Sequence, residues 1–443
     1  MMSDNLHRLV GLVDDDASEA YRTHRQALLG MVDDWLLRDP RREHLLGGAP
    51  PTLAAENHAN HHRLMGNVFA LRNAEILLRV LPWVFSAYQA RGFSSDYFDR
   101  AMQAWRDAVW AMLPEPARAQ ISAVYDELRL LVQAYAQQPQ APAEASVEPS
   151  FETQAQEVGG TGQAPNRQEL GGTGQAPNQQ ELGGTGQAPN QQELGGTGQA
   201  PNQQELGGTG QAPNRQEAKP ISAPEVLQWF GRENEFLQTL LKADSRRALQ
   251  LAQGWVSSPE DLRLFYSMVV HRVMVDIGRA WQANRISVAQ EHLATAIVSR
   301  VMSTLFSGIA LPEPHRGRAM VTCAAGELHE LGGRMVADAL ELDGWDTDYL
   351  GANTPIADVL DAVERNRPRV LGISVAMPFH LTQAVELISA LRERFRSDSP
   401  RIMLGGRAMA FAPLLWKQAG ADGLASTVFE ATRLAARLVE TRA

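Results

Sequence analysis

"AAGELHELGG", residues 324–333, decides how the carboxyl-terminal part of this chain folds. The residues before it, "RAMVTCAA" (318–325), have the composition of a short buried strand, and those after it show apolar residues at helical spacing up to Gly344. A strand that leads directly into a helix is typical of a parallel sheet, where ligands bind at the carboxyl ends of the strands. His329 lies in the connecting loop between two glutamates, so we expect a binding site there.

Strand and helix patterns continue to alternate to the end of the chain. Short apolar runs predict strands, and helical spacing returns between them. The predicted strands are Arg318–Ala325, Trp345–Leu350, Arg369–Met377, Arg401–Gly406 and Asp422–Ser426, and the helices begin near Glu330, Ile356, Leu381, Ala410 and Val428. This order predicts an α/β domain with a doubly wound parallel sheet, of the Rossmann-like kind, over residues 313–443.

The loop after the first strand lacks the motifs of nucleotide-binding sheets. No G-x-G-x-x-G follows that strand, and no G-x-x-x-x-G-K-[ST] occurs anywhere in the chain. The loop offers instead Glu327, His329 and Gly332. An imidazole there can reach a bound metal, and a carboxylate two residues earlier can hold its other nitrogen. A glycine three residues later lets the helix begin close to a bulky planar ligand.

Three motifs in this region occur together and in order. They are "ELHELG" (327–332), "GISVAM" with Ser374, and "MLGGRA" with Gly405 and Gly406. With them, the last 130 residues of the chain resemble the cobalamin-binding Rossmann domain, whose signature is Asp-x-His-x-x-Gly followed by a serine motif and a Gly-Gly motif. The glutamate at 327 departs from the aspartate of many family members and gives the carboxylate a longer reach.

The resemblance implies a role for each of these residues. His329 would be the lower axial ligand of cobalt, with Glu327 and Leu328 beside it. The displaced nucleotide tail of the cofactor would enter a cleft next to a serine and three glycines, Gly332, Ser374, Gly405 and Gly406. The alternative is a surface histidine whose hydrogen bonds are already satisfied.

The preceding segment, residues 221–312, predicts a small bundle of three or four amphipathic helices. In "AWQANRISVAQEHLATAIV" (280–298), nine residues separate a tryptophan from a Glu-His pair. This arrangement resembles the helical cap of CarH-type cobalamin photoreceptors, in which these residues line the pocket of the upper adenosyl group. The resemblance implies a lining made of Trp281, Val288, Glu291 and His292. The alternative is a tryptophan in the bundle core and a charged pair that faces solvent.

Residues 1–138 predict an all-helical domain, because apolar residues recur every three to four positions between Gly- and Pro-containing breaks. Photoreceptors of the CarH type begin with a MerR-type winged-helix domain, which this block does not resemble. It holds 14 arginines and 17 acidic residues and no helix dense in basic side chains. Direct nucleic-acid binding is therefore not expected, and we predict self-association or a protein partner through this domain.

A histidine cluster in this domain, His58, His61 and His62, has the helical spacing of metal or haem ligands. It could make the domain a second ligand sensor. Arginine and asparagine surround the cluster and no partner ligand can be named, so the sequence favours a solvated helix face.

Residues 139–220 predict a flexible linker. From 158 to 217 a twelve-residue unit, "LGGTGQAPNQQE" with small variations, occurs five times. Each copy holds at most one large apolar residue, which is too little to bury a core.

Composition narrows the remaining possibilities. A net charge of -10 argues against a dedicated nucleic-acid surface, and the single cysteine, Cys323, excludes a disulfide framework and cysteine-cluster metal sites. No segment approaches 18 uncharged apolar residues, so we expect no membrane partner and a cytoplasmic protein.

Two functions fit the assembly. One is a cobalamin-binding, light-responsive sensor that is not an enzyme and acts in transcription regulation, with adenosylcobalamin favoured over methylcobalamin. The alternative is a corrinoid protein that carries a methyl group for partner methyltransferases. The Trp and Glu-His arrangement favours the sensor, as does a chain without a zinc-thiolate site.

Overall fold

Five parallel strands form the sheet that positions the site. The computed structural model describes residues 2–136, 229 and 231–440, all of which belong to one unit by their contacts. The strands are β1 (Arg318–Cys323), β2 (Asp346–Tyr349), β3 (Val370–Ser374), β4 (Arg401–Gly405) and β5 (Gly423–Ala425), and they lie in the order β2-β1-β3-β4-β5. From β1 the chain adds β2 on one side and then returns to add β3, β4 and β5 on the other side, and all neighbouring strands are parallel. The predicted doubly wound parallel topology is therefore confirmed.

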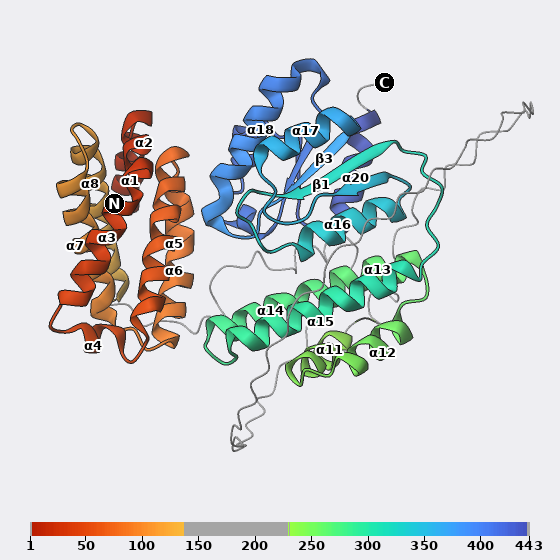
Figure 1. The fold of residues 1–443 in the computed structure, drawn as a ribbon, viewed down its shortest axis with the longest axis horizontal. Helices are drawn as coiled ribbons and strands as arrows, with labels where there is room; N and C mark the ends of the chain where they lie inside the picture. Colours follow the sequence, from red (N-terminus) through yellow and green to blue (C-terminus); the bar gives the residue numbers. More distant parts are fainter. Residues whose placement is uncertain (1, 137–228, 230, 441–443) are drawn as a thin grey trace, which may run out of the picture. The chain divides into compact units, whose positions relative to one another are not determined.

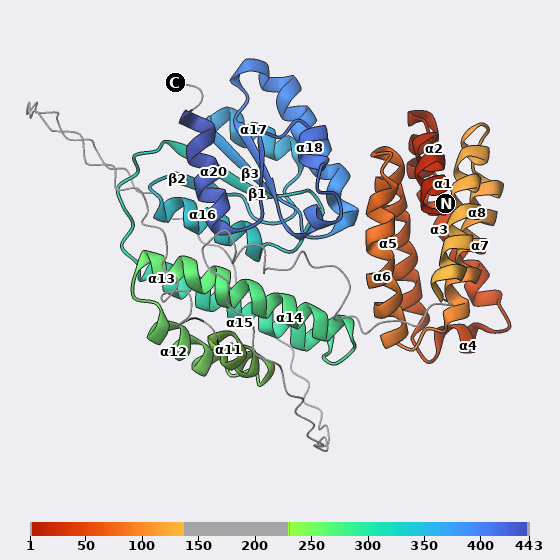
Figure 2. The ribbon, with the colours of Figure 1, turned by 180° about the vertical axis from the view of Figure 1, so that it is seen from behind.

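Helices cover both faces of this sheet (Figures 1 and 2). Helices α16 (Leu331–Leu342) and α20 (Val428–Glu440) pack on one face, and α17 (Ile356–Asn366) and α18 (Leu381–Phe395) on the other. Because neither face is left to solvent, the central strands β1, β3 and β4 are almost continuously apolar, and in β1 only the first residue is exposed. The edge strand β2 is polar and no residue in it is buried.

One predicted helix of this domain is wrong. Instead of a helix beginning near Ala410, the structure has a 3-10 turn, η5 (Arg407–Ala410), and a short helix, α19 (Leu415–Gln418). Pro413 lies between them, and a proline has no N–H with which to continue a helix.

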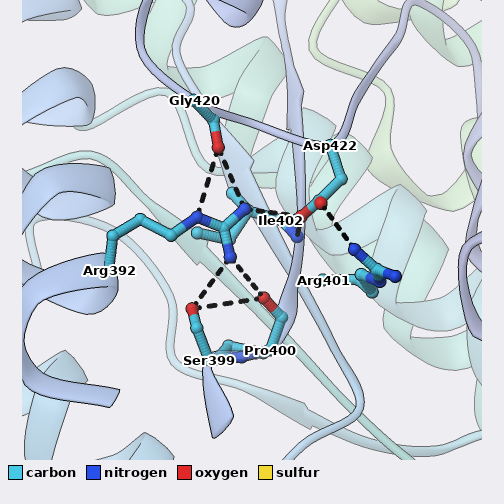
Figure 3. Close-up of polar contacts among 7 residues, drawn as sticks. All are labelled: Arg392, Ser399, Pro400, Arg401, Ile402, Gly420 and Asp422. Atoms are coloured by element: carbon cyan, nitrogen blue, oxygen red, sulfur yellow. Dashed lines mark hydrogen bonds and ion pairs between the residues drawn. The ribbon is translucent and has the colours of Figure 1, made fainter. Parts of the chain in front are cut away.

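A charged network closes the edge of the sheet opposite the site (Figure 3). Arg392, near the end of α18, donates to four groups, namely the carbonyl oxygens of Pro400 and Gly420, the hydroxyl of Ser399 and the carboxylate of Asp422. Asp422 in turn accepts the Ile402 N–H at 2.7 Å and a hydrogen bond from Arg401 at 3.0 Å. These residues lie where β4 and β5 begin, so the network fixes the amino-terminal ends of two strands and leaves the carboxyl-terminal edge for the ligand.

The predicted helical cap is present before the sheet. It consists of α11 (Arg232–Leu241), α12 (Ser245–Trp255), α13 (Pro259–Leu264), the π-helical turn η2 (Phe265–Val270), α14 (His271–Gln282) and α15 (Val288–Ser307). In the π-helical turn, the Tyr266 hydroxyl donates to the Asp338 carboxylate on α16 at 2.6 Å, and both side chains are buried. This hydrogen bond ties the cap to the helix that follows the His329 loop.

The amino-terminal region is all-helical, as predicted. Its helices are α1 (Met2–Gly11), α2 (Asp15–Thr23), α3 (Arg25–Arg38), α4 (Arg42–Leu46), α5 (Pro51–Ala70), α6 (Ala74–Ala90), α7 (Ser95–Met112) and α8 (Ala117–Ala136). The predicted linker, residues 139–220, lies outside the described residues. None of the helices that the structure describes is long and apolar enough to span a membrane.

The interpretation of His58, His61 and His62 as a solvated face is wrong. His58 hydrogen-bonds the Asp33 carboxylate at 2.6 Å and the Tyr97 hydroxyl at 2.8 Å. The other two rings bond Tyr125 and Tyr21, and burial lowers the pKa of His61 to about 3 and that of His62 to about 4. Aromatic side chains of three other helices, α2, α7 and α8, therefore make an apparently polar helix face part of the core, and helical spacing alone does not reveal these contacts. No group of three or more metal-ligating side chains is found here or elsewhere among the described residues.

Candidate functional site

His329 lies in the loop between β1 and α16, at the carboxyl edge of the sheet. Its side chain is 62% exposed, and its Nδ1 is 2.6 Å from the Glu327 Oε1 atom. A carboxylate can only accept, so Nδ1 carries the proton and donates it. The Nε2 atom keeps its lone pair, and no described residue hydrogen-bonds to it. The imidazole therefore presents the tautomer that binds a metal from the exposed side.

Glu327 holds the His329 imidazole from its buried side. Its side chain is fully buried, and its Oε2 atom accepts the N–H groups of Ala376 and Met377, each at 2.9 Å. Burial alone would raise the pKa of Glu327, but hydrogen bonds from His329 and from the backbone outweigh it and lower this pKa to about 2. The ionised carboxylate in turn raises the pKa of His329, chiefly through their hydrogen bond. The longer reach of a glutamate is thus used to bridge the histidine and the loop after β3.

The predicted cleft residues lie at the point where the strand order reverses. Ser374 ends β3 and pairs with Cys323 of β1 on one side and Gly405 of β4 on the other. A Cβ atom built at Gly332, at the start of α16, would point at the Ser374 Oγ atom from 3.8 Å. The three motifs that are distant in the sequence therefore meet at one edge, where ligands bind in doubly wound sheets.

The glycine pair is required by the backbone. A Cβ atom on Gly405 would lie 2.7 Å from the Ala425 carbonyl oxygen. At Gly406 it would lie 2.3 Å from the Val375 carbonyl oxygen, and φ is +100°, a value that side chains strongly disfavour. Any larger residue would push β4 away from the loop after β3.

We expect Gly406→Ala to destabilise the protein far more than Gly420→Ala. Gly420 also has a positive φ, of +79°, but nothing lies within 4 Å of its added Cβ. Its substitution should cost only the backbone strain, about 1 kcal/mol, whereas Gly406→Ala adds a clash with main-chain atoms and should cost about 3 kcal/mol or more. Chemical denaturation of both variants measures this difference, and equal losses would show that the approach of Val375 is not constrained.

The cap residues lie on helices α14 and α15. Val288 and His292 are exposed, and Glu291 accepts a hydrogen bond from Thr295 at 2.9 Å. The pKa of His329 is raised chiefly by its hydrogen bond to Glu327, and the charge of Glu291 adds to this. Trp281, at the end of α14, packs under the Arg91 guanidinium instead, and no hydrogen bond or ring contact among the described residues joins it to the Glu291–His292 pair.

Sequence reasoning missed the residues that support this loop from other strands. The Asn353 side-chain oxygen accepts the Gly326 N–H at 2.8 Å, and the backbone N–H of Asn353 donates to the Glu327 carbonyl oxygen at 2.9 Å. Asn353 adopts φ of +51°, and the stretch "GANTP" after β2 is a turn signal from which it could have been found. The amides of Ala376 and Met377 carry no sequence signal, because any residue there supplies an N–H.

The comparisons with known proteins agree with this geometry. Models of the B12 binding domain match residues 317–433 and, separately, residues 232–305. This part of the chain belongs to a family of cobalamin-binding proteins. The HTH-type transcriptional repressor CarA of Myxococcus xanthus is 33% identical over 124 residues, which cover 28% of this chain and 41% of CarA.

The relatives in a second group are named corrinoid proteins, after the class of cofactor to which cobalamin belongs. Dimethylamine corrinoid protein 1 of Methanosarcina mazei is 28% identical over 115 residues, 26% of this chain and 52% of that protein. The solved monomethylamine corrinoid protein of Methanosarcina barkeri superposes with a TM-score of 0.41 at 20% identity, over 47% of this chain and 98% of that one. The chain spans about half the length of the curated relatives that it matches.

The residues present fit a cobalamin. Its corrin ring brings four nitrogen ligands to cobalt, so a single exposed imidazole is all that the lower face needs from the protein. Leu328, beside that imidazole, is 71% exposed, an apolar side chain that a corrin ring would cover. Gly332 has only the Ser374 Oγ atom within 4 Å of an added Cβ, so it leaves room beside that hydroxyl where a nucleotide tail would enter.

We expect Glu327→Gln to weaken ligation of cobalamin by about 10- to 100-fold, the usual cost of losing the partner of a metal-bound histidine. The amide keeps the shape of the side chain but removes the charge that holds Nδ1–H and accepts two backbone N–H groups. Glu330→Gln is the matched control, because its side chain, on the other side of His329, makes no hydrogen bond to a described residue. Titration followed by absorption spectroscopy compares them, and equal affinities would contradict the role of Glu327.

Proposed function

We propose that this protein is a light-responsive cobalamin regulator and not an enzyme, and that its upper ligand is an adenosyl group. Visible light cleaves the cobalt–carbon bond of an alkylcobalamin, which is the chemistry that the cofactor supplies. The protein holds the lower face through His329 and senses the upper face through the cap. The output is a change in self-association or in the access of a protein partner to the amino-terminal domain.

The observation that carries this proposal is the Glu291–His292 pair at the start of α15. The pKa of His329 is raised chiefly by its hydrogen bond to Glu327, and the charge of Glu291 adds to this, which supports a cap whose first turn of α15 lies near the cobalt position. The His292 side chain is 73% exposed and paired with Glu291 at 3.5 Å, so it is available to a group on the upper face. The similarity to a transcriptional repressor, CarA, supports the same proposal.

The residues of this chain can convert loss of an upper group into motion. Val288 and His292 would contact that group and lose the contact when it leaves, while the His329–Glu327 pair keeps the lower face fixed. A ligand shifts a conformational equilibrium only by the difference between its contacts in the two states. A movement of the cap would then strain or break the buried Tyr266–Asp338 hydrogen bond, because this bond joins the cap to α16.

A methyl carrier is the second candidate. The dimethylamine corrinoid proteins of Methanosarcina mazei and Methanosarcina barkeri are each 28% identical to this chain over 115 residues. In that role the cap would open to partner methyltransferases, and light would have no structural consequence.

The test is to load the full-length protein with adenosylcobalamin in the dark, illuminate it, and follow the absorption spectrum and the oligomer size together. We expect both to change, and the same protein loaded with hydroxocobalamin to show no change in size on illumination. A spectrum that changes while size, shape and partner binding all stay fixed would reject the regulator and favour the carrier.

A further inference from the structure

Helix α5 of the amino-terminal region contacts the segment that follows β3. The Asn67 side chain, 2% exposed, accepts the Thr382 N–H at 3.0 Å and donates to the Pro378 carbonyl oxygen at 3.2 Å. One turn before it, the Arg63 guanidinium lies 5.6 Å from the centre of the Phe379 ring. Both polar groups of a buried amide are thus used on this segment, and their removal would leave two backbone groups without partners.

The same segment holds the cobalt-ligand loop from its other end. The N–H groups of Ala376 and Met377 bind the Glu327 carboxylate, whose other oxygen holds His329. The His380 ring packs against the loop as well, since a Cβ atom on Gly326 would lie 3.0 Å from its Cε1 atom. Seven consecutive residues, 376–382, therefore connect Asn67 to the lower ligand through hydrogen bonds and close packing.

The amino-terminal region also contacts the cap. The Arg91 guanidinium donates to the carbonyl oxygens of Trp281 and Gln282 at 3.0 and 2.9 Å and lies 4.4 Å from the centre of the Trp281 ring. The amino-terminal region therefore contacts both the segment after β3 and the end of α14, and these two separate sets of contacts indicate a specific interface.

We propose that Asn67 is a positioning residue for His329, and that the amino-terminal helical domain is thereby an intramolecular partner of the cobalamin site. By fixing Pro378 and Thr382, Asn67 keeps the amides of Ala376 and Met377 directed at Glu327. Glu327 then holds the histidine ring in the orientation that presents Nε2. The inference rests on cobalamin binding through His329 and does not require a response to light.

The test uses the full-length chain with Asn67→Ala and with Asn67→Leu, which keeps the volume of the side chain so that α5 still packs. Asn60→Ala is the matched control, since this half-buried residue of the same helix makes no hydrogen bond to a described residue. Each protein is produced with 15N-histidine and saturated with unlabelled hydroxocobalamin, which is then reduced to the cob(II)alamin form. Electron paramagnetic resonance reads the fraction with a protein nitrogen on cobalt as 15N doublets, which differ from the 14N triplets given by the cofactor's own base. Circular dichroism verifies folding.

We expect both Asn67 variants to lose part of the histidine-ligated fraction and to bind cobalamin about threefold to tenfold more weakly, less than the loss for Glu327 because Asn67 acts through one more layer. The control should match the wild type. Folded Asn67 variants with the wild-type ligated fraction would overturn the inference while leaving cobalamin binding intact. If the wild type itself shows no protein nitrogen on cobalt, the proposed lower ligand fails and the inference falls with it.

Discussion

Replacing His329 with alanine is expected to reduce cobalamin affinity by about 100-fold or more and to remove the absorption and magnetic signature of histidine ligation. The loss should exceed the 10- to 100-fold effect of an outer-shell partner, because the variant removes the ligand itself. The buried Glu327 carboxylate would lose the imidazole N–H, its shortest hydrogen bond, but would keep the backbone N–H of residue 329. A cobalamin titration followed by absorption spectroscopy measures both effects.

His315→Ala provides the control for this variant. It removes an exposed histidine of the same domain whose ring bonds the Glu313 carbonyl oxygen, away from the loop after β1. We expect wild-type binding from it. If His329→Ala keeps the wild-type spectrum, the lower face is not ligated by this residue and the site assignment fails.

The second large effect concerns the upper face. We expect Trp281→Ala to lower the affinity of the protein for adenosylcobalamin by about 10- to 100-fold and its affinity for hydroxocobalamin much less. Burying an aromatic side chain against a ligand is worth about 1.5–3 kcal/mol, which corresponds to that range. The variant also breaks the stacking of Arg91 on the indole, but this contact does not depend on which upper group is bound. Dissociation constants for both cofactors, measured in the dark, give the comparison.

Trp110→Ala is the matched control. Trp110 is 48% exposed on α7 and stacks with Arg106 and Arg118 within the amino-terminal region. Equal losses for the two cobalamins in Trp281→Ala would show that the tryptophan stabilises the cap without selecting the upper group.

The sheet and the Glu327–His329 pair could be predicted because their signals are local. A buried parallel strand is a continuous apolar run, and the glycine that must have a positive φ, Gly406, is visible as a letter in the sequence. The Glu327–His329 pair is separated by one residue, so a single loop conformation brings the two side chains together.

The parts that escaped prediction depend on contacts between distant residues. His58 and His62 look polar on an isolated helix, and only the tyrosines of other helices bury them. Asn67 is one asparagine among several in a helix, and its partners lie more than 300 positions later in the chain. No periodicity or motif encodes such a pairing.

The measurement that tests the central claim most directly is electron paramagnetic resonance of the cob(II)alamin form bound to protein in which only histidine carries 15N. The axial nitrogen splits each cobalt line into a triplet when it is 14N and into a doublet when it is 15N. With unlabelled cofactor, ligation by His329 predicts triplets in unlabelled protein and doublets in labelled protein, and the doublets should disappear in His329→Ala. Triplets that persist in the labelled wild type would mean that the cofactor's own base stays on cobalt, and this would contradict the account.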